Sequence, residues 1–412
     1  MYKIISLISF LILLIFVSCD NEKPKNELNT GTWRGEIIAQ NNSIPFNFEI
    51  IKIENNYKIN LINGDEVLPI DEVKIKDDSL FFNMHIFDVS VKAKIENDML
   101  TGSYSKNYAD DYILPFKAVY GKKNRFDNMT SDPDFDGTWE TTFLSKEGKE
   151  IPAIGIFKTD NNKLKGTFLT KTGDYRFLDG YAKNDTMHLY TFDGDHIYKF
   201  MAVKQNDSIL KGEFWSGKTG YKTFISKKNS KAKLPDPNQL TFLKDRYDKI
   251  SFSFQGLDGN PITLSDKKYK NKVILLQIFG TWCPNCMDET KFLSEWYDQN
   301  KERGVEIIGL AYENKKNGKA DFQYAKSRVE KMKSKYHVAY DFVIAGTSST
   351  KSASESLPML SKVISFPTTI FIDKKGNVRR IHTGFSGPAT DRYYEEFIDE
   401  FNTFMDMLLE EE

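Results

Sequence analysis

Residues 279–286 read Phe-Gly-Thr-Trp-Cys-Pro-Asn-Cys, a C-x-x-C pair where a predicted strand meets a predicted helix. Before the pair, residues 272–279 contain an unbroken apolar run, typical of a parallel strand covered on both faces. After it, residues 287–299 carry apolar side chains at three- and four-residue steps, which predicts a helix with one buried face. We therefore expect Cys283 near a helix N-terminus, where unpaired N–H groups favour a thiolate. A thiolate there can attack a disulfide, and Cys286, one turn later, can resolve the mixed disulfide.

The rest of the C-terminal part, residues 239–412, alternates between strand and helix patterns. It opens with a predicted hairpin around Asp258-Gly259. The alternation predicts an α/β domain with a central sheet. Its expected strands are 272–279, 305–312, 339–345, 368–373 and 378–383, and its expected helices are 286–302, about 319–335, about 353–363 and 390–409.

The N-terminal part carries an internal repeat. Gly31-Thr32-Trp33 recurs 106 residues later as Gly137-Thr138-Trp139, and short alternating segments separated by Asn, Asp and Gly turns follow each copy. We predict two β-rich repeats at residues 31–121 and 137–226, each an antiparallel meander or barrel. The second should hold about eight strands. The Gly-x-Trp opening resembles the first strand of lipocalin-like barrels; the alternative is that Trp33 and Trp139 are simply core aromatics at strand starts. Neither copy carries a cluster that suggests catalysis, so we interpret the repeats as binding or spacer modules.

The first 30 residues indicate export. Residues 1–18 are apolar after Lys3 but short for a membrane span, which is typical of a signal peptide. The run ends in Ser18-Cys19 and then turns polar, which resembles a bacterial lipoprotein signal with Cys19 as the lipidated residue and 19–30 as a tether. The resemblance implies a lipid-anchored protein of the bacterial cell envelope, facing the periplasm or the surface. An ordinary signal peptide with an incidental cysteine is the alternative.

Charge and cysteine content exclude several classes of function. The chain of 412 residues has 57 basic and 58 acidic side chains and a net charge of -1, so it offers no basic surface for nucleic acid. Of three cysteines, only the C-x-x-C pair remains when Cys19 is set aside, which excludes a structural disulfide framework. A zinc site would need four ligands, and the five histidines are scattered. We expect neither a metal nor another cofactor.

The C-terminal part resembles the TlpA/ResA type of thioredoxin-like protein, the membrane-tethered thiol-disulfide oxidoreductases of bacterial envelopes. The resemblance rests on the Asp-Gly hairpin, the Trp282-Cys283-Pro284-Asn285-Cys286 motif, residues 304–309 as the next strand, and residues 365–373, Ser-Phe-Pro-Thr-Thr-Ile-Phe-Ile-Asp. It implies a thioredoxin-like fold, protein or peptide thiols and disulfides as substrates, and an upstream electron donor.

The resemblance also assigns site residues. It implies that Pro367 is a cis-proline facing the two cysteines and that Trp282, Phe366 and Pro367 bind the substrate, with the Phe366 backbone presented to an extended peptide. Glu289 matches an acidic residue that the family places beneath its active site, where it could take the proton of Cys286. A solvated helix residue is the alternative interpretation of Glu289.

Two positions depart from the pattern. Gln277 stands where thioredoxins carry a buried aspartate, so a proton shuttle falls to Glu289 or to water. Lys291 stands where the family commonly has a helix-kinking proline, which leaves the shape of the active-site helix open.

Three functions remain in competition. We expect a thiol-disulfide oxidoreductase that acts as a reductase, with Cys283 as nucleophile and Cys286 as resolving thiol. A peroxiredoxin-like peroxidase is the first alternative, although Thr281 lies two residues before Cys283 and that family has its threonine three before. The second alternative is a ligand-binding or surface-binding β module with an accessory redox domain.

Overall fold

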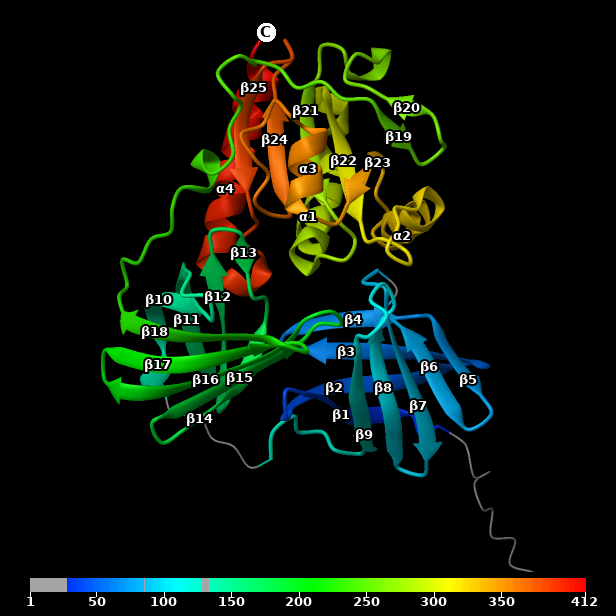
Figure 1. Cartoon of the computed structure of the whole chain (residues 1–412), viewed down its shortest axis with the longest axis vertical. Helices are drawn as coiled ribbons and strands as arrows, with labels where there is room; N and C mark the ends of the chain where they lie inside the picture. Colours follow the sequence, from blue (N-terminus) through cyan, green and yellow to red (C-terminus); the bar gives the residue numbers. More distant parts are fainter. Residues whose placement is uncertain (1–27, 85, 128–132) are drawn as a thin grey trace, which may run out of the picture.

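The computed structural model describes residues 28–84, 86–127 and 133–412, which form three parts in contact with one another (Figure 1). Two curved antiparallel sheets lie side by side, and a mixed sheet with helices packs against both. We name these parts the first β unit (residues 31–120), the second β unit (137–228) and the α/β unit (254–410). The expected signal peptide and Cys19 lie outside the described residues.

The first β unit is a meander of nine strands among the described residues, in the order β4-β3-β2-β1-β9-β8-β7-β6-β5. All neighbouring pairs are antiparallel. Buried and exposed side chains alternate along strands such as β7, because successive side chains point to opposite faces. The strands are β1 Gly31–Ala39, β2 Asn42–Ile53, β3 Asn56–Asn63, β4 Glu66–Ile70, β5 Val73–Lys76, β6 Ser79–Asn83, β7 Val89–Glu96, β8 Met99–Lys106 and β9 Ile113–Tyr120.

The second β unit is also antiparallel, in the order β11-β10-β18-β17-β16-β15-β14-β12-β13, and pairing of β11 with β12 closes it into a barrel. Its nine described strands exceed the expected eight because β13 has only two residues, too few for a periodic pattern. The strands are β10 Gly137–Ser145, β11 Glu150–Asp160, β12 Lys163–Thr170, β13 Gly173–Asp174, β14 Leu178–Lys183, β15 Thr186–Phe192, β16 Ile197–Asn206, β17 Ile209–Ser216 and β18 Gly220–Lys228.

The two β units share a buried tryptophan at the start of their first strand. Trp33 and Trp139 are fully buried, and each indole N–H donates to the carbonyl four residues earlier, Asn29 at 3.0 Å and Phe135 at 2.9 Å. This common arrangement supports the proposal of a duplication. Aromatic side chains fill the interior of the second barrel, which argues against a ligand-binding role for it: Phe143, Phe168, Phe200, Phe214 and Phe224.

The α/β unit has a seven-stranded mixed sheet, in the order β20-β19-β23-β22-β21-β24-β25. The central strands β21, β22 and β23 are parallel, and β24, β25 and β19 run antiparallel to their neighbours. β21 and β22 are buried along their whole length, as their apolar runs predict. The strands are β19 Phe254–Gly256, β20 Pro261–Ile262, β21 Val273–Phe279, β22 Val305–Glu313, β23 Asp341–Thr347, β24 Thr368–Ile372 and β25 Val378–Thr383.

Helices cover both faces of this sheet. Alternate residues of β21 pack with α1, α2 and α4 on one face, and the others pack with α3 on the opposite face. The third helix, expected at 353–363, ends earlier because the backbone before Pro358 disfavours the helical conformation. The helices are α1 Pro284–Asn300, α2 Phe322–Lys335, α3 Thr350–Ser356 and α4 Arg392–Glu410, with short 3-10 turns η1 Pro133–Phe135, η2 Pro237–Gln239, η3 Lys267–Tyr269, η4 Lys301–Arg303 and η5 Pro388–Thr390.

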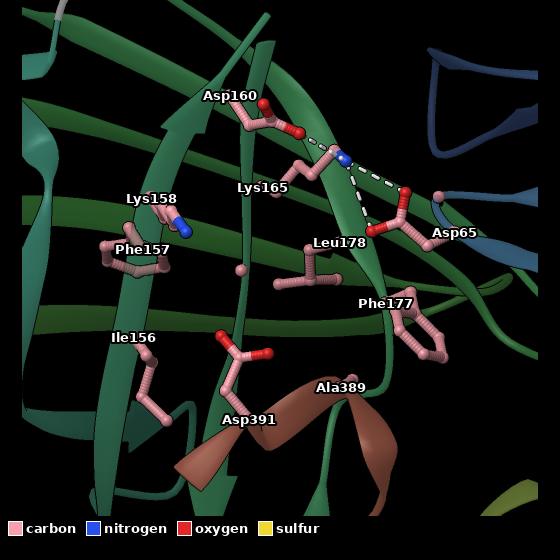
Figure 2. Close-up of a pocket in the computed structure, with 12 residues that line it drawn as sticks. Asp65, Ile156, Phe157, Lys158, Asp160, Lys165, Phe177, Leu178, Ala389 and Asp391 are labelled. Atoms are coloured by element: carbon pink, nitrogen blue, oxygen red, sulfur yellow. Dashed lines mark hydrogen bonds and ion pairs between the residues drawn. The ribbon is translucent and has the colours of Figure 1, made fainter.

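Polar contacts join the three parts. Figure 2 shows Lys165 of β12 between two carboxylates, its Nζ 2.9 Å from Asp160 Oδ2 and 2.8 Å from Asp65 Oδ1 of the first β unit. A cavity of about 160 Å³ beside it is also lined by Ala389 and Asp391 of the α/β unit. The first β unit and the α/β unit meet again at α2, where Lys331 Nζ donates to Glu72 at 2.7 Å.

The expected fold class is confirmed: an all-β N-terminal region of two units precedes an α/β domain with a central mixed sheet. Within the described residues, no helix combines the length and apolar character needed to cross a bilayer.

Candidate active site

The two cysteines lie at the first turn of α1, as their sequence context predicts. Cys283 is the N-cap residue in extended conformation, and Pro284 occupies the first helical position. The backbone N–H of Cys286 donates to Cys283 Sγ over 3.3 Å. A sulfur held by an N–H donor at a helix start is in the environment that stabilises negative charge. Both cysteines are free thiols, and Cys283 is 8% exposed whereas Cys286 is fully buried.

The loop before β24 faces the first cysteine. The Phe366-Pro367 peptide bond is cis, and the Cys283 thiol lies 3.6 Å from the Phe366 carbonyl oxygen. The Trp282 ring meets the Phe366 ring edge to face at 5.4 Å, and its indole N–H donates to Tyr312 O at 2.8 Å. The fold thus brings together Trp282, Cys283, Phe366 and Pro367.

Glu289 lies behind the pair and is buried, 1% exposed. Thr369 Oγ1 donates to one of its carboxylate oxygens at 2.7 Å, and Gln277 Nε2 donates to the other at 2.9 Å. Burial raises the pKa of Glu289 to about 7, even though both hydrogen bonds lower it. Burial also raises the pKa of the Cys286 thiol well above its usual value, with smaller contributions from Cys283 and Glu289. The solvated alternative for Glu289 is therefore wrong, and a group able to exchange a proton near neutral pH stands beneath Cys286.

The two departures from the family pattern have clear places in the structure. Gln277 is fully buried and donates to Glu289, while its carbonyl accepts from Tyr340 OH at 3.3 Å. It thereby supplies a neutral donor to the buried Glu289 carboxyl. Lys291 points away from this centre, with Nζ 3.6 Å from Glu66 Oε1 and 3.7 Å from Asp288 Oδ1.

A second buried carboxylate, Glu313, was not identified from the sequence. It ends β22, is 2% exposed, and accepts from Thr281 N at 2.8 Å and Thr281 Oγ1 at 2.6 Å. Burial raises its pKa to about 7. The sequence signal that could have identified Glu313 is a charged residue at the end of an apolar strand pattern. Because Thr281 directs its hydroxyl to Glu313, its geometry does not favour the peroxidase alternative.

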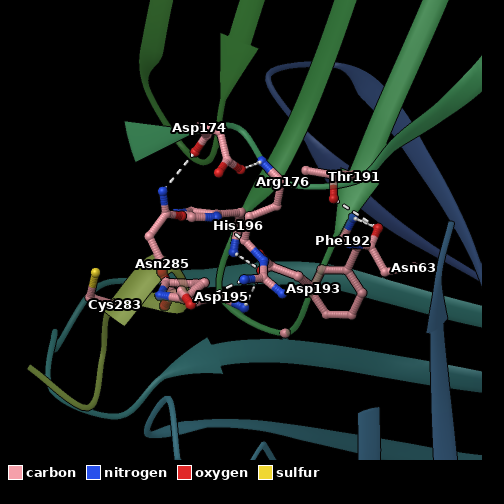
Figure 3. Close-up of polar contacts among 12 residues, drawn as sticks. Asn63, Asp174, Arg176, Thr191, Phe192, Asp193, Asp195, His196, Cys283 and Asn285 are labelled. Carbon is pink, nitrogen blue, oxygen red and sulfur yellow. Dashed lines mark hydrogen bonds and ion pairs between the residues drawn. The ribbon is translucent and has the colours of Figure 1, made fainter. Parts of the chain in front are cut away.

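Arg176 of the second β unit is a further residue that the sequence did not indicate (Figure 3). Its guanidinium, 1% exposed, donates to Pro284 O at 3.0 Å and to the Asp288 carboxylate in the first turns of α1. It also donates to both Glu66 carboxylate oxygens at 2.6 and 2.7 Å, and its Nε lies 3.0 Å from Asp193 Oδ2. One buried cation therefore joins all three parts of the molecule next to the cysteine pair.

The carboxylates around Arg176 respond differently to burial. Burial raises the pKa of Asp288 to about 6, although Arg176 faces it. At Asp193 burial also raises the pKa, but His196 and Arg176 outweigh it and leave the pKa below its usual value. His196 Nδ1 lies 3.0 Å from Asp193 Oδ2. The cluster is thus held together by charge pairing between side chains that have little contact with solvent.

The part of the chain that the structure describes contains no cluster of three or more His, Cys, Asp or Glu side chains placed to hold a metal ion. The arrangement instead offers a thiol at a helix start, a second buried thiol one turn later and a carboxyl with a pKa of about 7. These groups suffice for thiol-disulfide exchange with internal proton transfer.

Stability should fall as the pH rises from about 5 to about 7. Glu289 and Glu313 hold their protons more firmly in the folded chain than in the unfolded chain, so folding takes up protons in this window and is favoured below it. Each pKa shift, from 4.5 to about 7, lowers the free energy of unfolding by about 3 kcal/mol once the pH lies above both values. Urea unfolding at several pH values, monitored by the circular dichroism signal of the helices, measures this change in stability. The Glu289→Gln, Glu313→Gln double variant should flatten the decline, and an equally steep decline in that variant would contradict the assignment.

Comparisons with known proteins concern the C-terminal part of the chain. A family model described as Redoxin matches residues 244–397. The thiol-disulfide oxidoreductase ResA of Bacillus thuringiensis subsp. konkukian is 31% identical over 148 residues, 36% of this chain and 73% of the relative. ResA of Geobacillus kaustophilus is 31% identical over 133 residues, 32% of this chain and 66% of the relative. A crystal structure of a thioredoxin-family thiol:disulfide interchange protein from Chlorobium tepidum is 22% identical over 36% of this chain and 94% of that chain, with a TM-score of 0.27.

Proposed function

We propose that this chain, which belongs to the TlpA/ResA-type thioredoxin-like thiol-disulfide oxidoreductases, reduces disulfides of proteins or peptides at a bacterial cell envelope. The observation that carries the proposal is the position of Cys283 at the start of α1, with Phe366 and Pro367 in front of it. Cys286 and Glu289 lie buried behind it.

The first step is attack by the Cys283 thiolate on one sulfur of the substrate disulfide. The substrate S–S bond breaks, a mixed disulfide with Cys283 forms, and the other substrate sulfur leaves as a thiolate that takes a proton from solvent. Trp282 and Phe366 flank the attacking sulfur and hold the substrate chain beside it.

The second step is attack by Cys286 on the Cys283 sulfur. Its thiol needs help to ionise, because burial raises its pKa well above the usual value. Glu289 takes this proton, a Cys283–Cys286 disulfide forms as the mixed disulfide breaks, and the substrate sulfur leaves as a second thiolate that takes a proton from solvent. Two electrons have then passed from the cysteine pair to the substrate, and an upstream dithiol donor restores the pair by the reverse exchange.

The cellular location rests on the first residues of the chain. The apolar stretch that ends at Ser18-Cys19 supports export and a lipid anchor on Cys19, facing the periplasm or the surface. Mass spectrometry of the mature N-terminus is the measurement that decides it.

Trapping of a mixed disulfide tests the mechanism. In Cys286→Ser the resolving thiol is absent, so a linear disulfide-bonded peptide should accumulate on Cys283 in near-stoichiometric amount. The double variant Cys283→Ser, Cys286→Ser is the control and should trap none. If the single variant folds and traps no partner, Cys283 is not the nucleophile and the proposed function is wrong.

A further inference from the structure

The surface beside Cys283 is covered on one side by the second β unit. The turn between β12 and β13 reaches across it: Asn285 Nδ2 donates to Asp174 O at 3.1 Å, and Ser365 Oγ donates to Thr172 O at 2.9 Å. The Gly387 N–H donates to the Asp174 carboxylate at 2.7 Å. The covered side thus extends from the C-x-x-C motif to the loop after β25.

The covering segment, residues 170–176, packs closely against the main chain of the α/β unit. Gly173 has a φ of +130°, and a Cβ there would lie 2.3 Å from Asn285 Nδ2. A Cβ on Gly384, the residue after β25, would lie 2.8 Å from the Thr172 carbonyl carbon. A substrate cannot pass between these surfaces while they are in contact.

Trp282 and Phe366, which contact each other beside Cys283, are each partly exposed, whereas Pro284, Asn285 and Gly384 on the covered side are buried. A substrate therefore reaches Cys283 over the exposed parts of Trp282 and Phe366 rather than over the covered side.

The cover is firmly held. The Asp174 carboxylate accepts from Arg176 N at 2.6 Å (Figure 3). It also accepts from Gly387 N at 2.7 Å. Arg176 is in turn paired with Glu66, Asp193 and Asp288. The segment 170–176 is thus an integral part of the site.

We propose that residues 170–176 of the second β unit select the substrate, admitting disulfides carried on extended peptides and excluding those embedded in folded proteins. The reason is geometric. A folded partner presents a broad face, of the order of 800 Å² in a stable complex, and needs the surface on both sides of the cysteine. An extended chain needs only a strip beside Phe366. This inference rests on the proposed function and narrows its substrate class.

Gly173→Ala tests the inference, because a φ of +130° is strained for a residue with a Cβ and the added methyl group would crowd the Asn285 amide, so the turn should shift. We expect its kcat/KM for insulin to rise roughly tenfold, as when a steric block is removed. The value for a linear peptide carrying a glutathione mixed disulfide should stay close to that of the unaltered chain. Gly148→Ala is the matched control: Gly148 also has positive φ, +79°, but no atom lies within 4 Å of its Cβ position.

Alkylation gives a second measurement that does not depend on turnover. In the reduced chain, Cys283 should react readily with iodoacetamide and slowly with a maleimide on a polyethylene glycol chain. Gly173→Ala should raise the rate with the polyethylene glycol maleimide and leave the rate with iodoacetamide unchanged. Ser365→Ala, which removes the hydrogen bonds from Ser365 Oγ to Thr172 O and Phe366 O, should change the maleimide rate in the same direction to a smaller extent.

The inference is overturned if Gly173→Ala and Ser365→Ala both keep the original ratio of the two alkylation rates, or if Gly148→Ala changes it equally. Failure of the proposed function would appear differently, as absence of a trapped partner in Cys286→Ser with the alkylation pattern intact.

Discussion

Arg176→Met should lower the free energy of unfolding by about 3–5 kcal/mol, the cost typical of removing one partner from a buried ion pair. Methionine keeps most of the volume and removes the charge. Three carboxylates with little exposure, Glu66, Asp193 and Asp288, would then lose the guanidinium that they share. The partly exposed Lys291 would remain near Glu66 and Asp288, at the longer distances of 3.6 and 3.7 Å. Because the three carboxylates come from the first β unit, the second β unit and α1, the loss should also weaken the contact between the three parts.

Lys165→Met is the matched control. Lys165 also connects the two β units, through Asp65 and Asp160, but these partners are largely exposed and solvent screens the pair. We expect little change in its urea midpoint. The two variants are compared by urea unfolding and by hydrogen exchange at the start of α1. If Arg176→Met unfolds at the same urea concentration as Lys165→Met, the buried cluster does not hold the parts together.

The local features of the redox domain could be predicted from the sequence. The apolar run of β21, the helical spacing of α1 and the two cysteines between them are short-range patterns, and the structure reproduces them with shifts of one or two residues. The expected cis-Pro367 opposite the pair came from the family resemblance and is present. Strand-rich N-terminal units followed from the turn residues between short alternating segments.

The long-range features could not be predicted. Arg176 reads as one more charged residue near a turn, and nothing local connects it with Glu66 or Asp288, which are 110 and 112 residues away. The turn at Gly173 carries no periodic signal, so its position over Asn285 follows only from the packing of the units. The sequence context of Glu289 allowed either a solvated or a buried carboxylate, and its burial in the packed structure distinguishes the two.

Glu289→Gln should slow the resolving step by roughly 100-fold, the lower range for loss of a general base. Glutamine keeps the size of the side chain and can still accept from Thr369, but it cannot take a proton. The groups around Glu289 are Gln277, Thr290 and Thr369, which are neutral, and the titratable Tyr340 and Cys286. Burial raises the pKa of both titratable neighbours above neutrality, so Glu289 is the group in this set that changes charge near pH 7.

The pH dependence separates this role from a structural one. Below about pH 7 Glu289 holds its proton and cannot act as a base, so the breakdown rate of the mixed disulfide should rise as the pH passes through about 7. In Glu289→Gln this rise should disappear. Glu313→Gln is the control, because its carboxyl titrates in the same range but contacts Thr281. Rapid mixing of a preformed mixed disulfide across the pH range measures both. An unchanged inflection in Glu289→Gln would assign the proton to water, since Gln277 carries no carboxylate that could take it.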